Sequence, residues 1–392
     1  MHKLGLVVNP IAGIGGRVGL KGSDGAEIQR KALKLGAEPQ ASGRAMQALE
    51  QLKSLPDLVL ITYPGEMGEN AARVSGIEPT VIGAIDPGST TARDTVEAAR
   101  KMQRLGVDLL LFAGGDGTAR DIYLAIGEQL PVLGIPAGVK IHSAVYATNP
   151  ASAGRLAALY LQGRVSSLKE AEVMDIDEEA FRSGRVSARL YGYLKVPFRT
   201  SLVQSQKTAS IGGSGSLTAI AEDIVERMEP SCLYLVGPGT TTRAITDELG
   251  VAKTLLGVDV VQVADDVQAA ESRCTLVLAD ANEFELLDVL AGKSQAKIIV
   301  TLIGGQGFIF GRGNQQLSPR VIRAVSADPS EDGGAIQPWD NIIVVGTKEK
   351  LYALGSEPLR VDTGDPVLDE MLSGYVTVVT GYHERAVRRV SA

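Results

Sequence analysis

One stretch of the chain constrains its fold more than any other. Leu109–Phe112 is an apolar run that predicts a buried strand, and it leads into Gly114–Thr118, which reads GGDGT. Ala119–Glu128 then has apolar residues at helical spacing. Thr118 and Asp121 have the spacing of a capping box at the start of that helix. A strand that runs through glycines into a helix N-terminus offers main-chain N–H groups and a helix dipole to an anion.

Asp116 is the unusual residue of this turn. A carboxylate beside a bound phosphate is repelled unless a cation or a proton transfer compensates for it. Phosphoryl transfer provides both, because Mg²⁺ neutralises charge and a positioned carboxylate can take the proton of the acceptor hydroxyl. The alternative is a tight turn with a solvated Asp116, since turns favour glycine and aspartate in any case.

Two more glycine-containing turns follow expected strands. Asn9–Arg17 comes after a strand over Leu4–Val8, and Gly134–Ser143 comes after a strand over Pro131–Gly134. Alternation of strands and helices at this spacing predicts a parallel sheet with right-handed crossovers. All these turns then fall at one sheet edge, where open α/β folds bind ligands. A plain surface loop is the alternative for Asn9–Arg17.

Gly114–Thr118 looks like the signature of the NAD kinase and diacylglycerol kinase superfamily. Val7–Gly13 resembles the first strand and Asn-Pro turn of those kinases, and Gly134–Lys140 resembles their next nucleotide-site loop. Gly237–Thr242 resembles, more weakly, the Pro/Gly/Thr-rich loop of the NAD kinase C-terminal domain. Within the superfamily the chain is most similar to the ATP–NAD kinase/AcoX-like branch.

The resemblance implies that a phosphoryl group moves from ATP, or polyphosphate, to the 2′-hydroxyl of NAD. Mg²⁺ would bridge the donor phosphates, and Asp116 would orient or deprotonate the hydroxyl. No protein residue is assigned to a metal. The expected nucleotide and phosphate contacts are Asn9, Pro10, Gly13, Gly114, Gly115, Gly117, Thr118, Pro136, Gly138 and Lys140.

Weaker candidates for substrate contacts are Ser143, Gly237, Gly239, Thr240, Thr241, Gly304, Gly305 and Arg312. Arg312 has a glycine on each side, which keeps its approach to a phosphate open, but pairing with a surface carboxylate is an equal alternative. His142 is one of three histidines, and a structural role is favoured for it over a catalytic one.

The second half departs from the NAD kinase pattern. Glu172–Asp177 lacks the Asn-Glu or Asn-Asp pair that grips the NAD adenosine in those enzymes, and Leu217–Val325 contains extra strand–helix units. Two other functions therefore stay open. One is a kinase for another hydroxylated metabolite, and the other is a nucleotide-binding regulator of the AcoX type without catalysis.

The expected fold class is α/β, with an N-terminal parallel-sheet domain and a mixed C-terminal domain that contains antiparallel strands. The N-terminal nucleotide-binding domain is expected over residues 1–150, the C-terminal domain over 165–380 and a solvated basic tail over 381–392. Residues 169–198 read as a β-hairpin, residues 204–216 as a polar loop, and 151–162 as a helix that crosses between domains.

The net charge of −7 argues against a nucleic-acid partner, which needs a basic face, and against a lipid acceptor. Cys232 and Cys274 each open an apolar run and are expected to be buried thiols. No signal segment or apolar run of about 20 residues is visible, so a cytoplasmic protein without membrane contact is expected. The expected partners are small-molecule nucleotides, and the family suggests a homo-oligomer.

Overall fold

The computed structural model describes residues 2–20, 26–139, 141–176, 188–199, 202–203, 214–264, 274–291, 295–326 and 338–392. The chain divides into two compact units. The first unit comprises Met1–Gly15 and Lys21–Gln206, and the second comprises Gly16–Leu20 and Lys207–Ala392. Residues 165–206, which the sequence pattern assigned to the second domain, belong to the first of these compact units.

The first unit is built around a parallel sheet with helices on both faces. Its elements are β1 (His2–Val8), α1 (Ala26–Lys34), α2 (Ala41–Glu50), β2 (Leu58–Thr62), the 3₁₀ helix η1 (Gly65–Met67), α3 (Glu69–Val74), β3 (Thr80–Val81), α4 (Ala92–Arg104), β4 (Leu109–Gly114), α5 (Asp116–Ile126), β5 (Val132–Pro136), α6 (Pro150–Leu161), β6 (Leu168–Ile176) and β7 (Ala188–Pro197).

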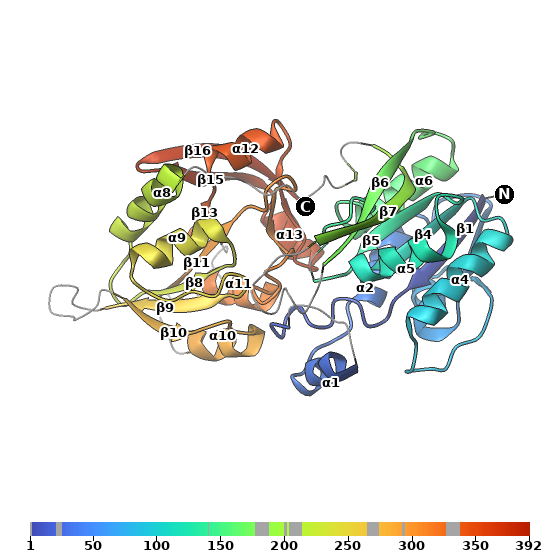
Figure 1. Cartoon of the computed structure of the whole chain (residues 1–392), viewed down its shortest axis with the longest axis horizontal. Coiled ribbons are helices and arrows are strands. Elements are labelled where there is room, and N and C mark those ends of the chain that lie inside the picture. Colours follow the sequence, from blue (N-terminus) through green and yellow to red (C-terminus); the bar gives the residue numbers. More distant parts are fainter. Residues whose placement is uncertain are drawn as a thin grey trace. The chain divides into compact units, whose positions relative to one another are not determined.

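The five strands of this sheet have the order β3-β2-β1-β4-β5, and every neighbouring pair is parallel. The direction in which successive strands are added to the sheet reverses between β1 and β4: β2 and β3 lie beyond β1, and β5 lies beyond β4. The loops after β1 and β4 therefore leave the same edge of the sheet, one on each side of this reversal point. Helix α2 packs with α6, and α4 packs with α5 (Figure 1). Ligands bind at such reversal points in open α/β sheets.

The apolar run Leu109–Phe112 forms the central strand β4. Each of its side chains is fully buried. Burying a large aliphatic side chain contributes about 1.5–3 kcal/mol, so the run is stable only where helices cover both faces.

The sequence suggested that the helix over residues 151–162 crosses between the domains. Helix α6 instead lies within the first unit. A side chain at Gly154 would collide with the carbonyl oxygen of Ala48 in α2, so the two helices pack at close range. Asn149 caps α6 by accepting the N–H of Ser152 at 2.7 Å.

The expected hairpin is present as β6 and β7, which form a separate antiparallel pair. It packs against α5 and β5 of the first unit. A side chain at Gly192 would collide with the ring of Tyr123 in α5, and Arg120 of α5 pairs with Asp175 of β6. The connection expected between the two strands lies outside the described residues.

The second unit is also α/β. Its elements are α8 (Ser214–Glu226), β8 (Leu233–Val236), α9 (Thr240–Glu248), β9 (Asp259–Val263), β10 (Cys274–Leu278), α10 (Glu283–Leu290), β11 (Ala296–Thr301), β12 (Phe308–Phe310), α11 (Pro319–Ser326), β13 (Ile342–Val345), α12 (Lys348–Leu354), β14 (Leu359–Val361), α13 (Pro366–Met371), β15 (Gly374–Gly381) and β16 (Glu384–Ser391).

The nine strands that the structure describes in this unit form one mixed sheet, in the order β10-β9-β8-β11-β13-β15-β16-β14-β12. β8, β11 and β13 are parallel neighbours, whereas β9 pairs antiparallel with β8, and β16 with β15. Successive residues of β8 belong to different cores, Leu233 and Leu235 to one and Tyr234 and Val236 to another. Both faces of this sheet are therefore buried, and the predicted α/β class with antiparallel strands is confirmed.

Several local expectations need correction. The expected basic tail is strand β16, which pairs with β15 and β14, because its apolar residue Val390 enters the core. Ser214–Ser216, expected in a loop, begin α8. Helix α5 begins at Asp116, so Thr118 lies inside its first turn and is not its cap.

Both cysteines are buried free thiols, as predicted. Burial raises the pKa of Cys232 above its ordinary value, which keeps this thiol protonated. Within the part of the chain that the structure describes, no helix combines the length and the apolar character needed to cross a bilayer.

Candidate functional site

Three loops of the first unit meet at the carboxyl edge of its sheet. They follow β1, β4 and β5, the same three strands after which the sequence places glycine turns. The N–H of Asn9 donates to the carbonyl oxygen of Ala113 at 2.9 Å, and the N–H groups of Ala137 and Gly138 both donate to Gly114 at 3.0 Å. The three turns are thereby joined through the main chain around the end of β4.

Glycine is required where these loops touch. A side chain at Gly138 would put its Cβ 2.7 Å from the Cα of Gly115, and one at Gly115 would come within 3.1 Å of the Cα of Gly138. Gly13 has φ +79° and lies against the carbonyl oxygen of Ala137. These contacts are to main-chain atoms, which cannot rotate away, so larger residues would separate the loops.

Asp116 is the charged residue enclosed by this arrangement. It is 5% exposed and begins α5 directly after the N-cap Gly115. Its Oδ2 accepts the N–H of His142 at 2.7 Å, and its Oδ1 accepts the N–H of Ser143 at 3.0 Å. The first turn of a helix stabilises a negative charge, and the two N–H donors add to this effect. The side chain thus ties the start of α5 to the loop after β5.

Two further side chains surround Asp116. The Nδ1 atom of His142 lies 3.4 Å from its Oδ2. Ser143 points the other way, since its hydroxyl donates to the carbonyl oxygen of Met174 at 2.8 Å and accepts the N–H of Met174 at 3.0 Å. Ser143, expected to contact substrate, therefore binds hairpin strand β6 with its side chain and Asp116 with its main chain.

Asn9 and Thr118 are brought together as a pair. The Nδ2 of Asn9 donates to the Thr118 hydroxyl at 2.9 Å, and its Oδ1 accepts the N–H of Ile11 at 3.3 Å. A side chain at Gly114 would collide with Thr118. Asn9 therefore holds the loop after β1 against the first turn of α5, in which Gly117 also lies.

Sequence reasoning missed one residue of this region. Tyr146 donates its hydroxyl to the carbonyl oxygen of Gly115 at 2.5 Å, and its ring packs where a side chain at Gly134 would lie. A tyrosine within an otherwise apolar segment gives little sequence signal of this contact. Of the expected residues at this edge, Pro136 ends β5, Pro10 follows β1, and Lys140 lies outside the described residues.

The candidates of the second half lie in the second unit. Gly237 and Gly239 connect β8 to α9, whose first residues are Thr240 and Thr241. The Nζ of Lys350 donates to the hydroxyl of Thr241 at 3.0 Å. Gly304 and Gly305 follow β11, the parallel neighbour of β8, so both turns leave the same edge of this sheet.

Arg312 is buried in the second unit, with 5% of its surface exposed. Its Nη2 lies 3.3 Å from the carboxylate of Asp362, and its guanidinium lies 4.8 Å from the ring centroid of Phe308. An anion at Arg312 would have to compete with the carboxylate of Asp362.

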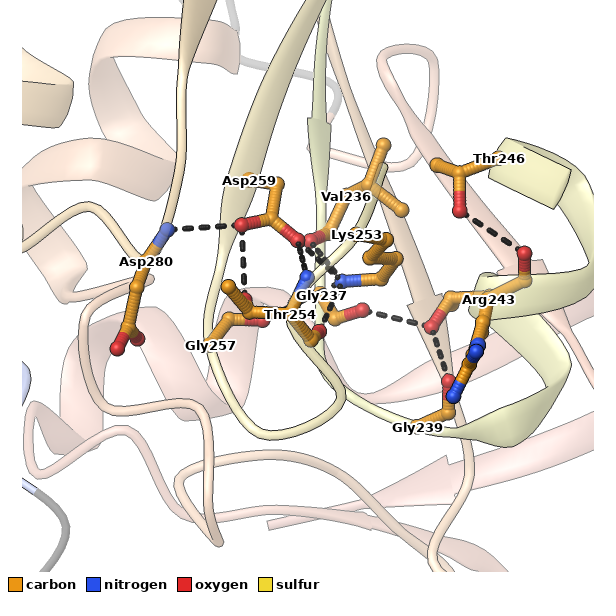
Figure 2. Close-up of polar contacts among 11 residues, drawn as sticks. Val236, Gly237, Gly239, Arg243, Thr246, Lys253, Thr254, Gly257, Asp259 and Asp280 are labelled. Carbon is orange, nitrogen blue, oxygen red and sulfur yellow. Dashed lines mark hydrogen bonds and ion pairs between the residues drawn. The ribbon is translucent and has the colours of Figure 1, made fainter. Parts of the chain in front are cut away.

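A buried polar cluster beside the Gly237–Gly239 turn was not predicted (Figure 2). The Nζ of Lys253 lies 3.0 Å from Asp259, and both side chains are fully buried. The same Nζ donates to the carbonyl oxygen of Val236, while Asp259 accepts the N–H of Thr254 at 2.9 Å. Burial lowers the pKa of Lys253 from its ordinary value, although Asp259 opposes the shift. The available sequence signal was a single carboxylate, Asp259, between the apolar residues Val258 and Val260.

The described residues contain no group of three or more His, Cys, Asp or Glu side chains that could hold a metal ion.

Two family models match the chain. The ATP-NAD kinase N-terminal domain matches residues 4–165, and the ATP-NAD kinase C-terminal domain matches residues 231–390. Among solved structures, the "putative diacylglycerol kinase from Bacillus anthracis str. Sterne" matches with 16% identity and a TM-score of 0.22. The match covers 45% of this chain and 43% of that chain. No curated protein matches the sequence significantly.

Proposed function

Because this chain belongs to the ATP-NAD kinase family, with both family domains matched in order, we propose that it transfers the terminal phosphoryl group of ATP to the 2′-hydroxyl of NAD. The family assignment makes the protein a kinase-type phosphotransferase. ATP as donor and NAD as acceptor are the finer part of the proposal, and polyphosphate is the alternative donor.

The observation that carries the proposal is the position of Asp116. A single carboxylate lies at the start of a helix, between the three glycine-containing loops at the sheet edge where the strand order reverses. The helix N-terminus and the loop N–H groups favour phosphate oxygens, whereas the carboxylate favours a hydroxyl proton. A site that joins both preferences suits the transfer of a phosphoryl group to an alcohol.

In the proposed reaction the acceptor oxygen forms a bond to the γ-phosphorus while the bond from that phosphorus to the bridging oxygen of ADP breaks. The hydroxyl proton moves to the Asp116 carboxylate. The main chain at Gly114, Gly115 and Gly117 contacts the phosphates, and Thr118, held by Asn9, fixes the first turn of α5. The protein contributes mainly positioning and stabilisation of charge.

Mg²⁺ would come with the donor phosphates. We assign it no protein ligand. The second-unit turns Gly237–Thr241 and Gly304–Gly305 stay as proposed substrate contacts. Arg312 and Lys140 belong to the same proposal, and the carboxylate of Asp362 would share the Arg312 guanidinium with a phosphate.

A second candidate is a nucleotide-binding protein without turnover. One observation favours it: both oxygens of Asp116 already accept main-chain hydrogen bonds, so the residue has a structural role whether or not it takes a proton. A kinase for another hydroxylated metabolite is the remaining alternative, since the second half lacks the Asn-Glu or Asn-Asp pair of NAD kinases.

Incubation with ATP labelled at the γ-phosphate, Mg²⁺ and a panel of hydroxylated acceptors, NAD first, separates the candidates. The proposal predicts labelled NADP. A different labelled product would replace NAD as acceptor, and nucleotide binding without any labelled product would favour the regulator. Polyphosphate in place of ATP, in a parallel reaction, identifies the donor.

A further inference from the structure

We propose that His142 is a positioning residue for Asp116, and that it reserves one oxygen of this carboxylate for the acceptor hydroxyl. Its main chain and imidazole engage Oδ2, which leaves Oδ1 as the oxygen that takes the proton. This inference rests on the proposed function, because it assigns a role within the same phosphoryl transfer.

The two oxygens of Asp116 have different surroundings. Oδ2 accepts the N–H of His142 at 2.7 Å and also faces Nδ1 of the same residue at 3.4 Å. Oδ1 accepts the N–H of Ser143 at 3.0 Å. An ionised carboxylate oxygen has two acceptor positions. His142 therefore presents both its main-chain N–H and its Nδ1 to Oδ2, whereas Oδ1 receives one N–H, from Ser143.

The imidazole lies where it can act on the carboxylate. The His142 side chain is 8% exposed and that of Asp116 is 4% exposed, so little water screens their interaction. A separation of 3.4 Å is long for a hydrogen bond, but catalytic hydrogen bonds often shorten when substrate binds. A shift of the carboxylate toward Nδ1 would shorten the contact between Nδ1 and Oδ2, and Oδ1 would then be the oxygen left for the acceptor hydroxyl.

The loop that carries His142 is itself held in place. Ser143 fixes it to β6 through two hydrogen bonds with Met174, and Tyr146 fixes it to Gly115. The ring thus approaches Asp116 from a braced segment. Misplacing a catalytic group by about 1 Å can lower a rate by about 10²-fold, which sets the size of the expected effect.

Three substitutions separate the imidazole from the main chain, because all of them keep the N–H of residue 142. His142→Asn places an amide nitrogen near the position of Nδ1, His142→Gln places one near Nε2, and His142→Ala removes both. His2→Gln is the matched control, since His2 begins β1 at the opposite edge of the same sheet.

We expect His142→Ala and His142→Gln to lower kcat about 10- to 100-fold while the KM for ATP changes less than about 2-fold. His142→Asn should recover at least half of the loss on a logarithmic scale, and His2→Gln should match the wild type. Thermal unfolding of each variant identifies loss through misfolding. If His142→Ala destabilises the fold, the comparison of His142→Asn with His142→Gln remains decisive.

Equal kcat values for the wild type and all three variants would overturn the inference. Equally low values for Asn and Gln at unchanged stability would also overturn it, because the role of Nδ1 would then be excluded. In both cases the proposed function survives if Asp116→Asn loses turnover. A wild-type protein without phosphoryl transfer to any acceptor would instead remove the proposed function.

Discussion

Gly115 and Gly138 meet main chain to main chain, and their contact fixes the distance between the loops after β4 and β5. A glycine in such a turn is commonly explained by the approach of a phosphate. Here the protein itself requires these glycines. The structural explanation predicts that a larger residue here destabilises the fold, whereas the ligand-binding explanation predicts that it weakens phosphate binding.

Gly138→Ala tests the role of the close contact between Gly138 and Gly115. Its Cβ would come 2.7 Å from the Cα of Gly115, so we expect a loss of about 1–3 kcal/mol in unfolding free energy and weaker ATP binding. Gly43→Ala in α2 is the control. No atom lies within 4 Å of its Cβ, and it should be neutral or stabilising by about 0.5–1 kcal/mol. Calorimetric titration with ATP and denaturant unfolding provide both readouts, and unchanged affinity in Gly138→Ala would contradict the account.

At the scale of elements, one residue, Ser143, links the hairpin β6–β7 to the candidate active site. Ser143 binds Met174 of β6 with its hydroxyl and Asp116 of α5 with its N–H. Arg120 and Asp175 make a second link between α5 and β6. The position of the hairpin is therefore coupled to that of the carboxylate, although the hairpin itself contains none of the expected catalytic groups.

Ser143→Ala removes both side-chain hydrogen bonds to Met174 and leaves the N–H to Asp116. We expect a loss of about 1–3 kcal/mol in stability and a lower kcat, because the loop that holds Asp116 loses its anchor. Ser89→Ala, at an exposed position of the first unit, serves as the control. If Ser143→Ala has wild-type kcat and wild-type melting temperature, the hairpin is not coupled to the site.

A second link between elements joins α8 to the β15–β16 hairpin in the second unit. Asp223 is fully buried and binds Arg385 at 2.6 Å, the N–H of His383 at 2.7 Å and Arg227 at 3.3 Å. Burial raises the pKa of Asp223, but the hydrogen bonds from Arg385 and His383 and the charges of Arg385 and Arg227 outweigh it and leave that pKa below its ordinary value.

Because the folded pKa of Asp223 is depressed, its contribution to stability is present above the unfolded pKa of about 4 and is lost as pH falls through the folded pKa. Asp223→Asn should therefore cost about 2–4 kcal/mol at neutral pH, and less as pH falls below about 4. The fluorescence of Trp339, the one tryptophan of the chain, follows unfolding of the second unit.

Asp247→Asn is the control. Asp247 forms an exposed pair with Arg243, so this substitution should cost at most about 1 kcal/mol at any pH. A cost of Asp223→Asn that does not depend on pH would contradict this assignment.

At the scale of the whole molecule, local patterns predicted most elements but not their grouping. The apolar run of β4 carries its signal in a few neighbouring residues. The placement of the hairpin on the first unit depends on contacts such as that of Gly192 with Tyr123, which are distant in sequence. Strand β16 was mistaken for a tail because Val390 is its only buried residue, and its charged residues come in two adjacent pairs that do not alternate with apolar ones.

The candidate site shows the same division. Its glycines and Asp116 could be read from the GGDGT motif, since a strand, a turn and a helix N-terminus are consecutive in sequence. The pairing of Asn9 with Thr118, and the contacts of His142 and Ser143 with Asp116, join loops that are distant along the chain. Likewise, nothing in the sequence near Arg312 identifies Asp362 as its partner.

The central claim is that the Asp116 carboxylate serves phosphoryl transfer and not only the fold. It is tested most directly by the rate at which labelled phosphoryl groups move from ATP to NAD in Asp116→Asn, with Asp86→Asn, an exposed position of the same unit, as the control. The account predicts a rate at least 10²-fold below wild type for Asp116→Asn, with retained ATP binding, and a wild-type rate for Asp86→Asn. A folded Asp116→Asn protein that transfers phosphate at the wild-type rate would contradict it.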